Sequence, residues 1–473
     1  MGGGPGIITH ELPKFFSKEH DVLFICPGAK TKLVRVNRRL QIAYISSEKQ
    51  QELSVPNLGV SNIFYIFKAL GNFRPEVIHS QDVDPISLLS QIWAVLHNVT
   101  FFHTIHVFPG QIGDFGMSEI SKSFARFYTS GLFINYITNY LNNSDALITL
   151  NAHVEKNVRD FGYQGKTYVI PNGLDFGRFK PCRPTNLKLK KKELLFVGFL
   201  SRRKNQIFLI EMMKFLPDNY HLTLIGDPIN ANYKYELLNF IRDNKLEQKI
   251  KIKDKLPHQE VVKYLARTHV FVSASVMELQ SLVILEALAS QTPVVGLDNE
   301  TIDEMIDDRV GHKLEKSSSP EQFAKSVDAL CRLSEQDYLN LCRNARAKVL
   351  SQDWQNVSKK FIEAYQEAIA HKQYRDQSQR LRMVDRIIPI FQDLLIVRFL
   401  KDYMSRFSSY LSLDKEKKHD DFAIKHRLRK RKLLKPNRQF FYVIFAVILS
   451  VSGFFTLRLI KNTKKIKDNL MRR

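Results

Sequence analysis

Cysteine is scarce in this chain, and its spacing points to neither a metal site nor a disulfide framework. Only four cysteines occur in 473 residues, at Cys26, Cys182, Cys331 and Cys342. No two of them form a CxxC pair or a zinc-type cluster, which argues against a zinc domain and a disulfide-rich secreted domain. We therefore expect reduced, intracellular thiols and no obligatory active-site metal.

Acidic residues are scarce near the C-terminal end. Residues 372–473 hold 26 Lys and Arg against 9 Asp and Glu, so most of the chain's net charge of +23 lies in this segment. Because the rest of the chain is only mildly basic, its charge does not favour nucleic acid as a partner. The same pattern makes an anionic membrane surface an expected partner of the C-terminal segment.

Long apolar runs are absent, with one exception. The first residues, MGGGPG, lack the basic and apolar regions of a signal peptide, so we expect the folded domains in the cytoplasm. Residues 440–457 form an uncharged run of 18 residues. At ~1.5 Å per residue this run reaches about 27 Å, just enough to span a bilayer core. We predict a single membrane helix there, preceded by a basic amphipathic segment at 372–438 and followed by a basic tail at 458–473.

The orientation of that helix is left open, because both of its flanks are basic. The segment at 383–411 is amphipathic, with Arg and Lys among large apolar residues. It fits a helix lying in a membrane interface and, almost equally well, a helix docked on the body of the protein.

Apolar strand patterns alternate with helix patterns through most of the chain. In the first half, strands are expected at 21–26, 40–45, 77–79, 99–103 and 145–149. In the second half, they are expected at 193–198, 221–227, 250–253, 271–273 and 292–296. This alternation predicts parallel sheets with helices on both faces. Ligands bind such sheets at the carboxyl ends of the strands.

Two stretches carry the most specific patterns. Residues 271–296, FVSASVMELQSLVILEALASQTPVVG, place Glu278 in a strand-to-helix loop and Glu286 inside the following helix. Residues 169–181, VIPNGLDFGRFKP, contain an Asn-Gly turn suited to a sharp reversal after a strand. Together these stretches resemble the donor-site signature and the interdomain junction of the retaining family-4 glycosyltransferases.

The resemblance spans residues from about 2 to 371 and implies a GT-B fold of two Rossmann-like domains. The first, at 1–168, would lie on the acceptor side, and the second, at 182–350, would bind a nucleotide sugar. The linker would be 169–181, and a helix at 351–371 would cross back onto the first domain.

The resemblance also implies roles for individual residues. Glu278 and His106 would act at the sugar, and His103, in the same FFHTIH string, is held in reserve. Lys204 would bind the diphosphate, and Glu286 would bind the ribose hydroxyls. The remaining candidates for donor binding are Gly4 and Gly6 in a first strand-to-helix loop, Gly226 near the base, Leu282 at the start of the helix, and Arg202 or Arg203.

Two departures from the family pattern keep other functions open. Phe199 stands where the family has an arginine, and no apolar strand precedes the loop at Gly4 and Gly6. The expected function is transfer of a hexose from a nucleotide-diphosphate sugar, a co-substrate and not a cofactor, to a lipid or lipid-linked acceptor. The alternatives are a membrane-tethered polysaccharide transferase and a non-catalytic scaffold that binds nucleotide sugars.

Overall fold

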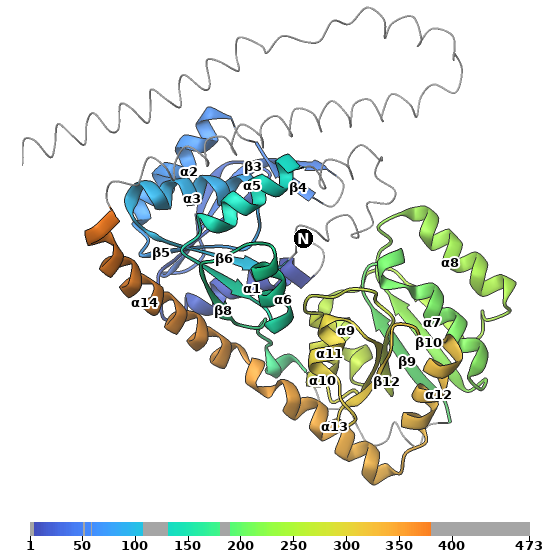
Figure 1. The fold of residues 1–473 in the computed structure, drawn as a ribbon. Coiled ribbons are helices and arrows are strands. Elements are labelled where there is room, and N and C mark those ends of the chain that lie inside the picture. Colours follow the sequence, from blue (N-terminus) through green and yellow to red (C-terminus); the bar gives the residue numbers. More distant parts are fainter. Residues whose placement is uncertain (1–3, 51–52, 58, 107–130, 180–189, 380–473) are drawn as a thin grey trace, which may run out of the picture. The chain divides into compact units, whose positions relative to one another are not determined.

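Figure 1 shows the fold in a computed structural model of the chain, which describes residues 4–50, 53–57, 59–106, 131–179 and 190–379. The chain divides into two compact units. The first, Met1–Leu58 with Asn62–Val397, contains two α/β domains. The second is Gly59–Ser61 with Arg398–Arg473, of which only residues 59–61 are described.

The predicted membrane segments fall mostly outside the described residues. Of the basic segment at 372–438, only 372–379 is described, and the membrane helix at 440–457 and the tail at 458–473 are not. Within the described ranges, no helix has the length and apolar character needed to span a bilayer. The membrane helix therefore stays a prediction.

The first domain holds two groups of four strands. In one group, β3 (Leu40–Gln50) pairs in parallel with β1 (Val22–Gly28) and antiparallel with β2 (Lys32–Arg35) and β4 (Leu53–Pro56). The other group is fully parallel, in the order β5 (Val77–Ser80), β6 (Thr100–Ile105), β7 (Ala146–Thr149), β8 (Lys166–Val169). Among the described residues, no strand joins β1 to β5, so the domain lacks one continuous sheet there. Its helices are α1 (Gly4–Phe16), α2 (Val60–Phe73), α3 (Pro85–His97), α5 (Gly131–Asn142) and α6 (Ala152–Asp160).

The second domain is built on a six-stranded parallel sheet in the order β11-β10-β9-β12-β13-β14. The strands are β9 (Lys192–Val197), β10 (Tyr220–Ile225), β11 (Ile250–Lys253), β12 (Val270–Ser273), β13 (Val294–Leu297) and β14 (Gly311–Leu314). The helices are α7 (Gln206–Met212), α8 (Ala231–Asp243), α9 (His258–Leu265), α10 (Leu282–Ala289), α11 (Glu300–Met305), α12 (Pro320–Cys331) and α13 (Glu335–Val349). The expected two-domain α/β fold with parallel sheets is confirmed.

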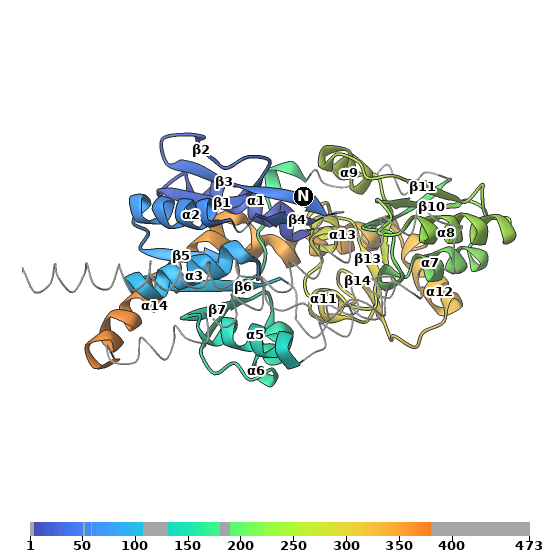
Figure 2. The ribbon, with the colours of Figure 1, turned by 90° about the horizontal axis from the view of Figure 1, so that it is seen from above.

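Alternate residues of β9 point to opposite faces of this sheet. Leu194 and Phe196 join a core that includes residues of α7, α8 and α12, whereas Leu195 joins a core that includes residues of α9 and α10. Figures 1 and 2 show helices on both sides of these strands. Helix α10 is almost wholly buried, which explains its run of Leu, Val, Ile and Ala.

The chain ends its described part in α14 (Trp354–Gln379), which packs against the first domain. Phe15 of α1 stacks on Trp354, with ring centroids 5.9 Å apart. Near the other end, Lys372 donates a 2.7 Å hydrogen bond to the carboxylate of Asp145. Residues far apart in sequence are thus joined within the first unit.

The placement of Gly4 and Gly6 in a strand-to-helix loop is wrong. Both residues lie in the first turn of α1. The Gly-Pro-Gly string is typical of a loop, but Pro5 has the fixed φ of a first helical turn and needs no intrahelical hydrogen bond there.

Candidate active site

The donor loop, residues 274–281, connects β12 to α10 at the carboxyl edge of the second-domain sheet. Its backbone is anchored at both ends. Val276 donates to the carbonyl of Arg203 at 2.9 Å, and Ser281 donates to the Thr301 hydroxyl at 2.9 Å. The carbonyl of Ser275 accepts from the amide of Asn299 at 3.0 Å. These contacts fix the loop between the segment after β9 and the start of α11.

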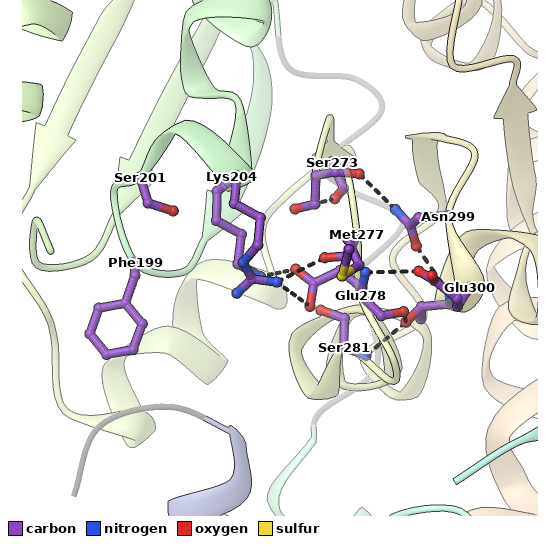
Figure 3. A network of polar contacts seen from close by, with 12 residues as sticks. Phe199, Ser201, Lys204, Ser273, Met277, Glu278, Ser281, Asn299 and Glu300 are labelled. Carbon is purple, nitrogen blue, oxygen red and sulfur yellow. Dashed lines mark hydrogen bonds and ion pairs between the residues drawn. The ribbon is translucent and has the colours of Figure 1, made fainter. Parts of the chain in front are cut away.

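Glu278 sits in the middle of this loop and is held on both sides of its backbone. Its N–H donates to a Glu300 carboxylate oxygen at 3.1 Å, and its carbonyl accepts from the Thr301 hydroxyl at 3.0 Å. Asn299 caps α11 by accepting from the backbone of Thr301 and Ile302. The conformation of Glu278 is therefore set before any ligand arrives (Figure 3).

Lys204 meets Glu278 across the site. The Lys204 ammonium contacts Glu278 Oε1, and the two side chains are only 11% and 10% exposed. Lys204 comes from the short 3-10 helix Arg202–Lys204 that follows β9. Burial, with the nearby Arg203 guanidinium, lowers the pKa of Lys204 to about 7.

The two neighbouring arginines are not equivalent. Arg203 donates to the Met277 carbonyl at 2.8 Å and lies 3.9 Å from Glu278 Oε2, with a side chain only 13% exposed. Arg202 is 61% exposed and pairs with Glu236 at 2.8 Å. Phe199 points away from Lys204 in Figure 3. The geometry thus favours Arg203 as the second cation of the site.

Gly198 and Gly226 directly follow the neighbouring strands β9 and β10, and their backbones are in close contact. Gly226 has φ +155°, and a Cβ there would lie 1.9 Å from the Gly198 carbonyl oxygen. Only glycine fits that approach at that backbone angle. The carboxyl ends of β9 and β10 are therefore held in close contact by this glycine pair.

Glu286 has a different partner from the Lys204–Glu278 pair. Its Oε1 is 2.8 Å from His258 Nε2, and this hydrogen bond raises the pKa of His258. Glu286, Leu282 and His258 line one small cavity together with Glu11 of α1 and Arg178. The two acids of the predicted signature thus have different partners: Glu278 contacts Lys204, and Glu286 contacts His258.

His106 follows β6 in the first domain, and its Nε2 lies 2.8 Å from Gln81 Oε1. Burial lowers its pKa to about 4, so the imidazole is neutral at physiological pH. His103, the reserve candidate, is 2% exposed, and its Nδ1 lies 2.7 Å from the Ser80 hydroxyl. The structure therefore gives His103 the contacts of a core histidine. Among the described residues, no hydrogen bond links His106 to Glu278 or Lys204.

The donor loop also contacts the first domain and the linker. The amide of Asn151, at the N-cap of α6, donates to the Leu279 carbonyl at 2.6 Å. The backbone N–H of Asn172 in the linker donates to Gln280 Oε1 at 2.7 Å. Both neighbours of Glu278 on its C-terminal side are therefore tied to elements outside the second domain.

Several residues that contact the candidate site residues were not predicted from the sequence. Gln81 and His258 are single polar residues whose partners lie 25 and 28 positions away. Asn299 and Thr301 follow β13, and only the rule that parallel strands share a carboxyl edge could have drawn attention to them. Ser201, beside Lys204 in Figure 3, has a buried hydroxyl without a hydrogen-bond partner in the described part of the chain.

Two family models match this chain, one for each domain. "Glycosyltransferase Family 4" matches residues 2–178, and "Glycosyl transferases group 1" matches residues 181–348. The solved structure of HepE from Anabaena in complex with UDP and glucose aligns with a TM-score of 0.60 and 16% identity, covering 78% of this chain and 98% of that one. At that identity the likeness concerns the fold alone.

Relatives at higher identity are also glycosyltransferases. Alpha-monoglucosyldiacylglycerol synthase of Streptococcus pneumoniae is 25% identical over 259 residues, which are 50% of this chain and 55% of that protein. Glycogen synthase of Mycobacterium tuberculosis is 24% identical over 331 residues, 67% of this chain and 74% of that protein. The chain thus spans about half the length of the first of these relatives. With residues 2–178 and 181–348 matched by these two models, the chain belongs to glycosyltransferase family 4.

Proposed function

We propose that this chain is a retaining glycosyltransferase that moves a hexose from a nucleotide-diphosphate sugar to the hydroxyl of a lipid or lipid-linked acceptor at a membrane. The observation that carries the proposal is the buried contact between Lys204 and Glu278 at the carboxyl edge of the second-domain sheet. This edge is where parallel sheets bind nucleotides.

The diphosphate would bind beside Lys204 and Arg203. Negative charge grows on the diphosphate as the bond to the sugar breaks, so cations fixed in a buried site stabilise the transition state more than the ground state. Glu286 would accept hydrogen bonds from the ribose hydroxyls, and Gly226 would leave room near the base. The solved neighbour HepE, with UDP and glucose bound, supports a nucleotide sugar as the ligand class.

The sugar would lie between Glu278 and His106. Glu278 would accept from a sugar hydroxyl when the diphosphate takes over its contact with Lys204. His106, neutral because burial lowers its pKa to about 4, would hydrogen-bond the sugar from the first domain. No protein nucleophile is required, since stabilisation of the leaving group carries the reaction.

A lipid acceptor is supported by a relative that is named for a glycolipid and by the surface of the first domain. Residues 22–47 contain five Lys and Arg and no Asp or Glu. These cations, at Lys30, Lys32, Arg35, Arg38 and Arg39, are all exposed on and around the β2–β3 hairpin (Figure 2). Leu33 and Val36, each 53% exposed, lie among them. Exposed cations interspersed with aliphatic side chains suit an anionic lipid surface.

The same hairpin also has a simpler explanation. β2 is an edge strand in the described sheet, and charges on edge strands prevent pairing with other molecules. In that case the acceptor could be a water-soluble glycan, as the name of the mycobacterial relative suggests. A scaffold that binds nucleotide sugars without turnover is the third possibility, motivated by Phe199.

A donor screen separates these three functions. The full-length chain would be incubated with a panel of nucleotide sugars and a membrane lipid extract, and products would be read by mass spectrometry. The proposal predicts a hexosylated lipid in the organic phase, and none with Glu278→Gln. A product found only in the aqueous phase would contradict the lipid acceptor, and no product with any donor would contradict the enzyme.

A further inference from the structure

Three polar side chains meet where β5 and β6 end. Gln81 follows β5, His106 follows β6, and His79 lies on β5 itself. The Gln81 amide lies between the two histidines, with its oxygen 2.8 Å from His106 Nε2 and its nitrogen 3.1 Å from His79 Nε2. Gln81 therefore links a histidine that follows β6 to one that lies on β5.

The His79 ring has a partner at each nitrogen. Its Nδ1 lies 2.6 Å from the Tyr365 hydroxyl of α14, and its Nε2 lies 2.6 Å from the Thr104 hydroxyl. The Gln81 nitrogen is nearly equidistant from both ring nitrogens, at 3.2 Å and 3.1 Å. The Gln81 nitrogen therefore contacts the His79 ring in addition to the Tyr365 and Thr104 hydroxyls and does not take the place of either.

This arrangement fixes which end of the Gln81 amide faces His106. An amide N–H is attracted to an aromatic ring, whereas a carbonyl oxygen is repelled by its electron-rich face. The nitrogen thus belongs on the His79 side, and the carbonyl oxygen faces His106. Because a carbonyl oxygen only accepts hydrogen bonds, His106 Nε2 must carry a proton.

We propose that Gln81 is a positioning residue that holds His106 in the neutral tautomer with its proton on Nε2, leaving Nδ1 as the acceptor for a hydroxyl of the donor sugar. This inference rests on the proposed function, in which His106 contacts the sugar. It adds a residue and a specific hydrogen-bonding role that the sequence pattern does not assign.

The surrounding charges are consistent with a neutral ring. His106 interacts with His79 and His103, and burial lowers the pKa of all three histidines. His106 also disfavours a positive charge on His79, and both of these histidines disfavour one on His103. A second proton on His106 would remove the acceptor at Nδ1, so both the tautomer and the charge state matter for hydrogen bonding to the sugar.

Three variants of the full-length chain test the inference. Gln81→Leu removes the acceptor, and kcat should fall about tenfold, the size of one net hydrogen bond. Gln81→Glu keeps the shape but places a carboxylate beside His106, which raises its pKa. The rate of that variant should therefore be low under mildly acidic conditions and recover as the pH rises, while the wild-type rate shows no such step. Gln336→Leu, on the exposed face of α13, is the matched control and should behave as wild type.

A spectroscopic readout makes the test independent of turnover. With ¹⁵N-labelled histidine, the His106 resonances can be assigned by their loss in His106→Gln. The wild type should show a protonated Nε2 and an unprotonated Nδ1, and Gln81→Leu should lose that preference. Gln81→Glu, nearly isosteric with the wild type, keeps the test valid if the leucine variant unfolds.

The outcomes separate the inference from the proposed function. If His106→Ala retains the full rate, the role of His106 at the sugar is wrong. If His106→Ala is inactive but Gln81→Glu keeps the wild-type pH profile and His106 resonances, Gln81 does not position the ring. The second result overturns this inference alone.

Discussion

Lys204 and Glu278 are 74 positions apart in sequence, yet their side chains are in contact and almost fully buried. Each provides the other's counter-charge in the ligand-free site. A donor diphosphate would compete with Glu278 for the ammonium group and release the carboxylate toward the sugar. The Lys204–Glu278 contact would thus couple binding of the diphosphate to binding of the sugar.

The contact between Lys204 and Glu278 predicts that the effects of replacing both residues on the free energy of unfolding are not additive. Lys204→Ala leaves the Glu278 carboxylate buried with only the more distant Arg203, and the free energy of unfolding should fall by roughly 3 kcal/mol. Lys204→Ala with Glu278→Gln should be less destabilising than the two single effects added together, because the orphan charge is gone. Denaturant unfolding measures this, and additive effects would contradict the contact.

The same two variants should differ in kinetics. Lys204→Ala should weaken donor binding, since it removes a cation from the diphosphate, whereas Glu278→Gln should lower kcat more than donor affinity. Titration of a nucleoside diphosphate and steady-state rates separate the two effects. Unchanged affinity and unchanged rates in both variants would remove these residues from the site.

The lowered pKa of Lys204 predicts a pH dependence for donor capture. With a pKa of about 7, the free enzyme loses the ammonium charge as the pH rises above neutrality. The value of kcat/KM for the donor should therefore decline above pH 7, because this ratio reports groups of the free enzyme. Lys204→Arg, which stays charged, should show no such decline. A wild-type profile that stays flat to pH 9 would mean that Lys204 keeps its proton.

A substitution at Gly226 tests its close approach to the Gly198 carbonyl. Gly226→Ala forces a Cβ against the Gly198 carbonyl at a φ of +155°, so the free energy of unfolding should fall by about 2 kcal/mol or more. Gly71 is the matched control, since it lies in α2 with nothing within 4 Å of an added Cβ. Gly71→Ala should be neutral or stabilise the protein by up to ~1 kcal/mol. Equal effects in thermal or denaturant unfolding would contradict the close approach.

The β2–β3 hairpin predicts lipid-dependent binding. In the full-length chain, Arg35→Glu with Arg38→Glu should weaken binding to anionic vesicles by about tenfold or more, because each cation near such a surface contributes roughly 1 kcal/mol. Lys214→Glu with Lys316→Glu makes the same change of charge at exposed sites of the second domain and should have a much smaller effect. Vesicle co-sedimentation compares them, and equal losses would show that only net charge matters.

How much the sequence could predict depended on how local the signal was. The alternation of strands and helices follows from periodicity within each βα unit, whereas the donor loop and Lys204 were predicted from the resemblance to family 4. Gly4 and Gly6 were misplaced because Gly-Pro-Gly fits both a loop and a first helical turn. Arg202 and Arg203 could not be separated, since adjacent residues differ only in direction, which the fold decides.

Contacts between distant segments lay beyond the sequence. Gln81 is one amide among many until β5 and β6 place it beside His106. His258 becomes notable only because α9 and α10 bring it within 2.8 Å of Glu286. Both contacts form only when the fold brings neighbouring elements together. A single sequence does not show which residues will meet in this way.

The configuration of the product tests the central claim most directly. A retaining enzyme that uses an α-linked nucleotide hexose must form an α-linked product, and the proton NMR signal of the anomeric centre reports this linkage. We predict an α-glycoside in the lipid fraction with the wild type and none with Glu278→Gln. A β-glycoside, or undiminished product from Glu278→Gln, would contradict retaining transfer at this site.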